Sequence, residues 1–299
     1  TLVRSVKPMY NQKGYSEGEI LYKGKNVKSL SMLELSKIGY ISQDIENQIV
    51  TDKVWHELAF GLENMGIKNS EIRLRCGEMA AYFGIESWYN KKTSDLSTGQ
   101  KQLLNLASVM IMRPDLLILD EPVSTLDPVA ASEILERIFK LNRDFGITVL
   151  IVMHELEEIY SMVDKVVFID KKAVSMPARE MAGYLFKEEN PQTRALPQSS
   201  RIYGMLYEKE NLKITDESGI PISVSEGRNF MENNRESLDK YYRERRKCEN
   251  VNLKNSTYNY TKNNINHTTN NKKYIFLKHI YFKYDKGSDF VLEDLNLSI

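Results

Sequence analysis

The sequence predicts an α/β fold built on a parallel sheet, and two short apolar runs with a helix between them carry that prediction. Residues 116–119 and 147–153 are apolar almost throughout, which is typical of strands covered on both faces. Residues 130–142, between them, show one apolar helical face, formed by Ile134, Leu135, Ile138 and Leu141. This alternation of strand and helix indicates a parallel sheet, with both runs strongly buried.

The helix ahead of the first apolar run is predicted to begin at Ser97-Thr98-Gly99-Gln100. This tetrapeptide fits the S-x-x-Q capping box, in which the first and last side chains satisfy free backbone N–H groups at a helix start. A buried face follows at helical spacing, formed by Leu103, Leu106, Ala107, Met110 and Ile111.

Two carboxylates and a histidine are expected at one edge of this sheet. Asp120 and Glu121 follow the first apolar run, and His154 follows the second. Because open parallel sheets bind ligands at the carboxyl ends of their strands, these residues are candidates for a site. Taken singly the features are commonplace: a capping box usually only caps, carboxylates after a strand usually begin a turn, and a lone histidine is usually structural.

The order of these features is what distinguishes the chain. Residues 95–128 read DLSTGQKQLLNLASVMIMRPDLLILDEPVSTLDP and resemble the nucleotide-binding domain of ABC ATPases. LSTGQ is similar to the family's signature motif, LLILDEP to its Walker B strand and STLDP to its D-loop. The resemblance implies a P-loop NTPase-type α/β fold, with a parallel core sheet and a helical subdomain that carries the signature.

The resemblance also implies a role for each polar residue, with ATP and Mg²⁺ as cofactors. Asp120 would hold magnesium through water, and Glu121 would orient or deprotonate the attacking water. Gln43, at the end of a strand expected at residues 37–42, is similar to the Q-loop glutamine, which meets the magnesium and the water. His154 is similar to the H-loop histidine and would contact the γ-phosphate.

The signature would bind the ATP of a second nucleotide-binding domain in a head-to-tail dimer. Residues 97–100, with the helix N-terminus behind them, would grip its γ-phosphate, and Asp127 would link the two sites. Thr98 stands where the commoner LSGGQ has glycine. If that position needs a positive φ, Thr is costly there; otherwise the change is mild.

The phosphate-binding loop of the resembled family, G-x-x-x-x-G-K-[ST], does not occur in the 299 residues. Residues 18–25 read as a strand entering a tight turn, and a similar segment in the family follows the first helix after that loop. Thr1 would then be the last, nucleotide-binding Thr of a loop ending in Lys-Ser-Thr. We therefore expect a fragment incomplete at its N-terminus, and no ATP hydrolysis by the isolated chain, because that loop supplies the main phosphate contacts.

A second sequence pattern indicates which subfamily of ABC ATPases the chain resembles. Residues 46–61 read ENQIVTDKVWHELAFG, without the Pro of the family's usual NP-x-x-Q. ENQ followed by V-x-x-E-x-AFG-x-E-N-x-G resembles the ATPases of energy-coupling-factor (ECF) vitamin and metal importers, which implies that the Q-loop surface, Asn47–Trp55, faces a membrane subunit. The alternative interpretation is an ordinary amphipathic helix with Trp55, Leu58 and Ala59 buried.

The chain is expected to have four parts. These are a first nucleotide-binding domain (1–175), its C-terminal extension (176–231), a polar Asn-rich linker (232–273) and the opening strands of a second nucleotide-binding domain (274–299). Within the extension, PISVSEGR at residues 221–228 is similar to an element of fused ECF ATPases.

The last part contains two strand-like runs around Lys286-Gly287-Ser288, and the resemblance implies that Tyr284 stacks on adenine. If the first domain lacks its own opening strands, residues 18–27 form an unpaired edge, and open edges recruit strands. We therefore predict that residues 274–299 fold back onto residues 18–27, as in a circular permutant.

The function that the resemblance implies is ATP hydrolysis that energises import of a vitamin or metal ion through an integral-membrane subunit, at the cytoplasmic face of the cell membrane. A second nucleotide-binding domain, fused or separate, would be the other partner. Two alternatives stay open: a tandem ABC ATPase acting on ribosomes or DNA, and an inactive fragment that only binds partners. A formal net charge of zero argues against a nucleic-acid partner, and two distant cysteines exclude a disulfide framework.

Overall fold

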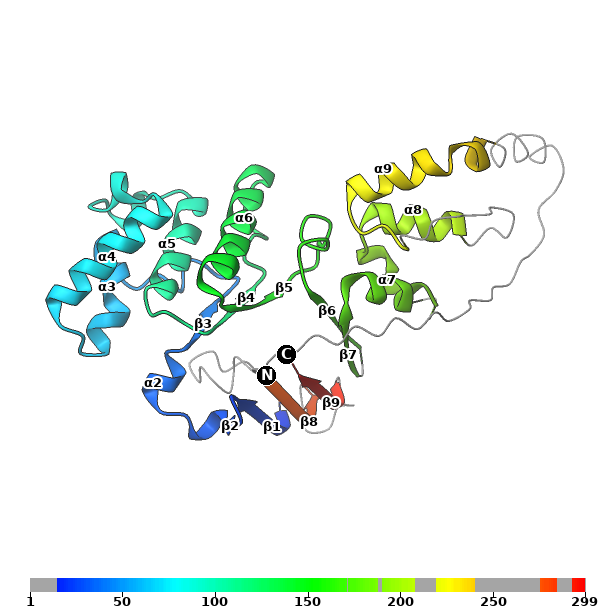
Figure 1. Ribbon diagram of the computed structural model, residues 1–299. Helices are drawn as coiled ribbons and strands as arrows, with labels where there is room; N and C mark the ends of the chain where they lie inside the picture. Colours follow the sequence, from blue (N-terminus) through cyan, green and yellow to red (C-terminus); the bar gives the residue numbers. More distant parts are fainter. Residues whose placement is uncertain are drawn as a thin grey trace. The chain divides into compact units, whose positions relative to one another are not determined.

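A computed structural model describes residues 15–170, 172–187, 190–207, 219–239, 275–283 and 292–298. These residues form two compact units (Figure 1): unit 1 comprises residues 25–154, and unit 2 comprises residues 15–24 together with the described residues from 155 onwards. The predicted sites Thr1 and Tyr284, the turn at residues 286–288 and most of the predicted linker lie outside the described residues.

Unit 1 alternates strands and helices. Its strands are β2 (Lys25–Asn26), β3 (Ile38–Ile41), β4 (Leu116–Asp120) and β5 (Thr148–Val152). Its α-helices are α2 (Met32–Leu35), α3 (Val54–Asn64), α4 (Asn69–Phe83), α5 (Thr98–Met110) and α6 (Pro128–Phe145). Three short 3-10 helices join them: η2 (Val27–Ser29), η3 (Glu86–Trp88) and η4 (Thr93–Asp95).

The predicted parallel sheet is confirmed in the order β3-β4-β5, with Ile41 opposite Leu119 and Asp120 opposite Val152. β4 is the central strand and is buried on both faces, since residues 116–119 are at most 4% exposed. β5 is half-buried and its Val152 is 49% exposed, so the expectation of a second strongly buried strand is wrong. The reason is its place in the described sheet, where β5 has a neighbour on one side only.

Helix α5 begins as predicted, with the capping box between Ser97 and Gln100. Its predicted buried face is correct except at one position: Leu103 is half-buried and Leu104 is fully buried instead. The cause is that α5 packs against β3, α3, α4 and α6, so that its buried surface is wider than one stripe. Gly39 in β3 permits this approach, because a Cβ there would lie 2.5 Å from Val109 Cγ1.

Helices α3 and α6 bury the faces expected of them, with one exception. Leu58 and Ala59 are buried, as the alternative interpretation of an ordinary amphipathic helix expects, but Trp55 is 37% exposed, which that interpretation does not expect. Trp55 lies in the first turn of α3, where its ring stacks on His56 with centroids 5.2 Å apart. In α6 the four predicted residues are buried, and Gly146 caps the helix with φ 62°.

Unit 2 contains the strands β1 (Tyr15–Tyr22), β6 (Lys165–Ile169), β7 (Ala173–Pro177), β8 (Ile275–Lys283) and β9 (Leu292–Ser298). Its helices are α7 (Ala178–Lys187), α8 (Gln198–Tyr207), α9 (Val224–Asn233) and the 3-10 helix η5 (Pro191–Ala195). β6 and β7 form an antiparallel hairpin.

The predicted fold-back of the C-terminal strands is confirmed. β8 pairs antiparallel with β1, from Tyr15 opposite Lys283 to Tyr22 opposite Ile275. β9 pairs antiparallel with the other edge of β8, so that β8 lies between β1 and β9. On β1, Ile20 and Tyr22 are buried.

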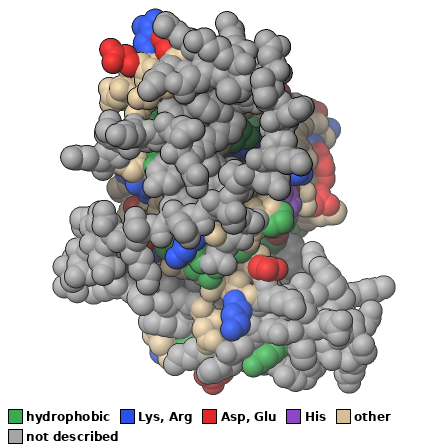
Figure 2. Space-filling model, turned by 90° about the vertical axis from the view of Figure 1, so that its right-hand side faces the viewer, with side chains coloured by type: hydrophobic (Ala, Val, Ile, Leu, Met, Phe, Trp, Pro, Cys, Tyr) green, Lys and Arg blue, Asp and Glu red, His purple; other side chains and the backbone are tan. Residues whose placement is uncertain are grey.

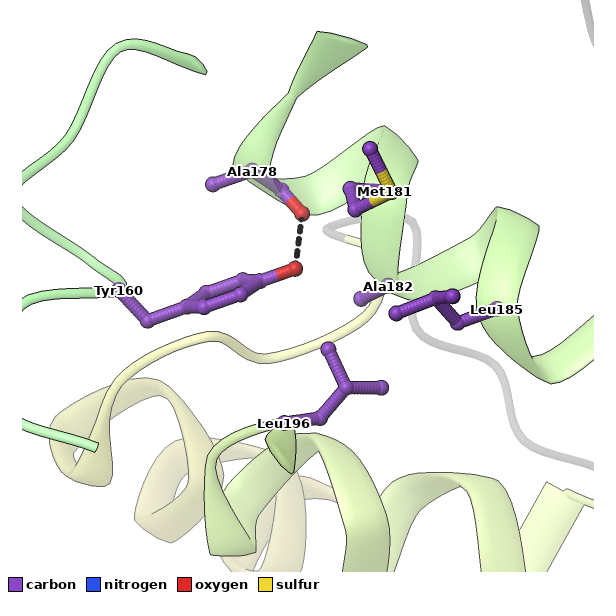
Figure 3. Close-up of a cluster of buried hydrophobic side chains, with 6 residues drawn as sticks. All are labelled: Tyr160, Ala178, Met181, Ala182, Leu185 and Leu196. Carbon is purple, nitrogen blue, oxygen red and sulfur yellow. Dashed lines mark hydrogen bonds between the residues drawn. The ribbon is translucent and has the colours of Figure 1, made fainter. Parts of the chain in front are cut away.

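The core of unit 2 lies between α7 and the segments that precede and follow it (Figure 3). Tyr160 is 1% exposed, and its hydroxyl donates to the Ala178 carbonyl at 2.9 Å. Burial raises the pKa of Tyr160, so the phenol stays protonated and keeps this bond. The other buried side chains of the cluster are those of Met181, Ala182, Leu185 and Leu196.

Residues 221–228 connect the three helices of unit 2. The Pro221 carbonyl accepts a hydrogen bond from Ser200 Oγ of α8 at 2.6 Å. Glu226 of α9 pairs with Arg179 of α7 at 2.9 Å. Helical structure continues at residues 235–239, where Leu238 is buried, so order extends past Met231, the predicted end of the extension.

On the face that Figure 2 shows, the described side chains include both acidic and basic residues. This agrees with the formal net charge of zero. Within the described ranges, no helix combines the length and apolar character that crossing a membrane requires.

Candidate functional site

Three loops of unit 1 place polar residues at the carboxyl edge of the parallel sheet. Gln43 follows β3, Glu121 follows β4 and His154 follows β5. The carboxyl ends of the three strands lie side by side at one edge of the sheet, because Ile41 lies opposite Leu119 and Asp120 opposite Val152. The sequence-predicted grouping of residues from three separate segments is therefore found in the structure.

Glu121 is the centre of this group. Gln43 Nε2 donates to Glu121 Oε2 at 3.2 Å, and His154 Nε2 lies 2.6 Å from Glu121 Oε1. Each carboxylate oxygen thus has its own partner, which fixes the plane of the carboxyl group. The Glu121 side chain is 17% exposed and that of His154 is 88% exposed, so the carboxylate is partly shielded from water while the imidazole lies at the surface.

The backbone of Glu121 adopts an uncommon conformation. Its φ is +46°, in the left-handed region that residues with a Cβ seldom occupy. The Glu121 N–H donates to the Val152 carbonyl at 2.9 Å, and the Glu121 carbonyl accepts from Ser124 Oγ at 3.1 Å. Such conformations cost about 1–3 kcal/mol and persist where the surrounding contacts hold them, often at functional sites.

Asp120 is the last residue of β4 and is half-buried. Its carboxylate accepts a hydrogen bond from the Tyr40 hydroxyl at 3.4 Å. Tyr40 was not a candidate from the sequence, although its place in β3, next to the predicted Walker B strand, is a signal that points to it. Apart from this bond, Asp120 presents carboxylate oxygen, which is the ligand type that magnesium prefers.

Among the described residues, no group of three or more His, Cys, Asp or Glu side chains is placed to hold a metal ion. Magnesium is usually bound by one or two carboxylates together with substrate phosphates and water, so it needs no such group. Asp120 is the residue of this edge that fits such a role.

The signature residues form the exposed N-terminus of α5. Ser97 Oγ accepts from the Gln100 N–H at 3.3 Å, and Gln100 Oε1 accepts from the Ser97 N–H at 3.0 Å. Thr98 is the first residue of the helix and is not among the described residues with positive φ, so its substitution for glycine is mild here. A Cβ at Gly99 would lie 3.6 Å from Ala130 Cβ, an ordinary contact.

Asp127 caps the next helix. Its Oδ1 accepts from the N–H groups of Val129 and Ala130, both at 3.1 Å, and Pro128 occupies the first helical position. In the described structure Asp127 therefore fixes the start of α6.

The loop between β3 and α3 is held at both ends by the side chains of Gln48 and Glu57, which belong to the ENQ and V-x-x-E patterns but had no role assigned from the sequence. Gln48 Oε1 accepts from the Ser42 N–H at 2.9 Å, and Gln48 Nε2 donates to the Tyr40 carbonyl at 2.8 Å. At the other end, the buried Glu57 carboxylate accepts from the Val50 and Thr51 N–H groups at 3.1 and 2.8 Å. Gln48 thereby fixes the backbone next to Gln43.

Two family models match parts of this chain. Residues 1–124 match the family model described as "ABC transporter", and residues 92–159 match one described as "AAA domain, putative AbiEii toxin, Type IV TA system". A "Putative ABC transporter ATP-binding protein" of Bacillus thuringiensis subsp. konkukian is 30% identical over 301 residues, which cover 100% of this chain and 49% of that protein. The chain spans about half the length of the Bacillus relatives that it matches.

Two further relatives are covered more completely. The "Energy-coupling factor transporter ATP-binding protein EcfA" of Methanocaldococcus jannaschii is 32% identical over 203 residues, which cover 67% of this chain and 72% of that protein. The solved structure of cbiO1 from Clostridium perfringens, described as part of the ABC transporter complex cbiONQ, is 30% identical with a TM-score of 0.50, covering 64% of this chain and 76% of that chain.

Proposed function

This chain belongs to the ABC transporter ATP-binding protein family, and on that premise we propose that it acts in ATP hydrolysis that energises import of a small substrate, a vitamin or a metal ion. The observation that carries the proposal is the Glu121 carboxylate, held between Gln43 and His154 at the end of the central strand. A carboxylate fixed on both oxygens and partly shielded from water is suited to act as a general base.

In this proposal each residue of the group has one task. Glu121 orients the attacking water and takes its proton, a contribution typically of ~10²–10⁴-fold in rate. His154, whose exposed ring already lies against Glu121, contacts the γ-phosphate. Gln43 holds the other oxygen of Glu121 and contacts the same water.

Magnesium, when bound, neutralises charge on the phosphates of ATP. Asp120 is the residue that would hold it, through water, from the end of β4. The Tyr40 hydroxyl keeps the Asp120 carboxylate in place by its hydrogen bond.

The exposed N-terminus of α5 would bind the γ-phosphate of ATP held by a second nucleotide-binding domain, fused or separate. Backbone N–H groups and the helix dipole favour an anion at such an end. Ser97 and Gly99 are the nearest contacts, and Asp127, which sets the start of α6, would relay between the two sites. The 299 residues contain no G-x-x-x-x-G-K-[ST] loop, so we propose that the chain by itself does not hydrolyse ATP.

The membrane partner is proposed to contact the surface Asn47–Trp55. Its apolar members Val50 and Trp55 are 65% and 37% exposed, and Lys53 beside them is exposed. This surface would contact the cytoplasmic side of an integral-membrane subunit. Lys53→Glu should therefore weaken co-purification of the chain with that subunit, whereas Lys28→Glu, elsewhere on unit 1, should not. Unaltered assembly after Lys53→Glu combined with Trp55→Ala would contradict this surface.

The hydrolytic role is tested with Glu121→Gln in the natural protein expressed from its complete gene. The amide has the same size but cannot take a proton, so ATP binding should persist while turnover falls at least ~100-fold. Glu63→Gln, which alters a glutamate paired with His56, is the matched control and should keep turnover. If ATP affinity collapses together with turnover, Glu121 is a ligand and the proposed role fails.

A further inference from the structure

The two residues that follow the signature, Lys101 and Gln102, reach both loops that carry the Gln43–Glu121 pair. They are consecutive on α5, and neighbouring helical residues point about 100° apart. One therefore extends toward the loop after β3 and the other toward the loop after β4.

Lys101 pairs with the loop after β3. Its Nζ lies 2.5 Å from Glu46 Oε1, and Glu46 is three residues beyond Gln43. The Lys101 side chain is 14% exposed and that of Glu46 is 72% exposed. The lysine side chain is thus mostly covered by its neighbours, and it reaches a glutamate that stays at the surface.

Gln102 bonds to the loop after β4. It is 1% exposed, and its Nε2 donates to the Pro122 carbonyl at 2.7 Å. Pro122 directly follows Glu121, whose φ of +46° needs support from its surroundings. Gln102 Oε1 has no hydrogen-bond partner within the described structure. A buried amide left half-satisfied is costly, so a purely apolar side chain would suit packing better unless the donor is needed.

We propose that Lys101 and Gln102 are positioning residues that set the Gln43–Glu121 pair from the signature helix. A displacement of α5 moves Glu46 and Pro122 together, because both are attached to the same helical turn. The domain's own hydrolytic carboxylate therefore responds to what its signature binds. This inference rests on the proposed function, in which the signature contacts ATP and Glu121 acts on water.

The competing explanation is that the two contacts only stabilise the fold. Two contacts elsewhere in unit 1, one lysine–glutamate pair and one amide–carbonyl hydrogen bond, have the same distances between their polar atoms as these two. They therefore provide matched controls. Lys25 Nζ lies 2.5 Å from Glu34 Oε1, and Asn142 Nδ2 donates to the Ile147 carbonyl at 2.7 Å. Neither pair touches the candidate site.

The first experiment measures ATP turnover by the natural protein expressed from its complete gene. Gln102→Leu should lower kcat at least ~10-fold with KM for ATP within about twofold, because small misplacements of reacting groups are costly. Lys101→Glu should lower kcat roughly 2- to 5-fold, in keeping with an exposed partner. The exchange Lys101→Glu with Glu46→Lys should restore it. Asn142→Leu and Lys25→Glu should leave kcat unchanged even if they lower Tm.

The second experiment measures amide hydrogen exchange in the 299-residue chain and does not depend on hydrolysis. Gln102→Leu should accelerate exchange of the Glu121 and Ser124 amides at least ~10-fold, and Asn142→Leu should not. If the wild-type protein fails to hydrolyse ATP but this exchange effect is present, the proposed function fails and the positioning contact stands. If Gln102→Leu changes neither kcat nor exchange, or if the charge exchange does not restore kcat, the inference is overturned.

Discussion

His154 Nε2 meets Glu121 Oε1 at 2.6 Å although the histidine side chain is 88% exposed and the glutamate side chain only 17%. The pair therefore joins a glutamate side chain that the fold largely covers to a histidine side chain that is almost fully exposed. Pairs with an exposed member contribute little to stability, in general ~0–1 kcal/mol. A pair of this kind adds little to the stability of the fold, and in the proposed function it orients the hydrolytic carboxylate.

The first prediction concerns His154→Ala. In the natural protein, turnover should fall by roughly 10- to 100-fold, as expected for loss of a group that acts in proton transfer or on the phosphate, while ATP affinity changes little. Steady-state turnover and nucleotide titration measure the two effects. His56→Ala removes a His–Glu pair of 3.3 Å away from the site and should leave turnover intact. Unchanged turnover in His154→Ala would remove this residue from the site.

The second prediction concerns the backbone at Glu121. Glu121→Gly and Glu121→Ala both remove the carboxylate, so the difference between them isolates the cost of φ +46°. Glycine adopts this conformation without a Cβ penalty, so the Gly variant should be more stable than the Ala variant by about 1 kcal/mol. Urea denaturation of the 299-residue chain measures the difference. An Ala variant as stable as the Gly variant would show that the backbone is not strained.

The predicted ABC nucleotide-binding fold is confirmed by the parallel sheet and by the similarity to cbiO1. Central strands such as β4 are predictable because both faces are buried and the residues are apolar without interruption. Burial of β5 was predicted wrongly, because an apolar run does not reveal how many neighbours a strand has. The alternative interpretation buries Trp55, which is exposed, because helical spacing assigns a face to α3 but not the part of that face which stays uncovered.

The residues of the candidate site that follow the end of a strand could be predicted from the sequence. Gln43, Glu121 and His154 do so, and the structure brings them together. Gln102 and Gln48 could not be found in this way, because their role depends on which backbone carbonyl lies opposite. The position of Gln102, one helical turn before Leu106 of the predicted buried face, was nonetheless a signal, since a buried amide needs a partner.

The third prediction concerns the pH dependence of unit 2. Burial alone would raise the pKa of Glu226, but the hydrogen bond from the Ile222 N–H and the pairing with Arg179 outweigh it and hold the pKa below its ordinary value of 4.5. A lowered native pKa contributes stability above pH 4.5 that is lost as the pH falls through the native value. The stability difference between wild type and Glu226→Gln should therefore be largest near pH 7 and shrink below pH 4.5.

Chemical denaturation between pH 7 and pH 3 measures this difference. Glu232→Gln changes an exposed carboxylate of the same helix and serves as the control. A Glu226→Gln difference that stays constant over the whole range would contradict the lowered pKa.

The fourth prediction concerns the strand pairing that closes unit 2. Deletion of residues 274–299 removes β8 from the edge of β1, which leaves unpaired backbone groups and the otherwise buried Ile20 and Tyr22 at an open edge. We expect a loss of about 2 kcal/mol or more, since full burial of one such side chain is worth ~1.5–3 kcal/mol. Thermal unfolding should then begin about 4–8 °C lower.

The deletion also shortens the chain, and this could by itself change the unfolding temperature. A substitution that disrupts β8 without shortening the chain must therefore give the same result. Leu277→Pro removes a donor from β8, which lies between β1 and β9, and proline is poorly tolerated in such a strand. It should lower the unfolding temperature nearly as much as the deletion does. Asn264→Pro, in the polar segment before β8, should have little effect. If both the deletion and Leu277→Pro leave thermal stability unchanged, the pairing of β8 with β1 does not stabilise the chain, and the circular-permutant arrangement is wrong.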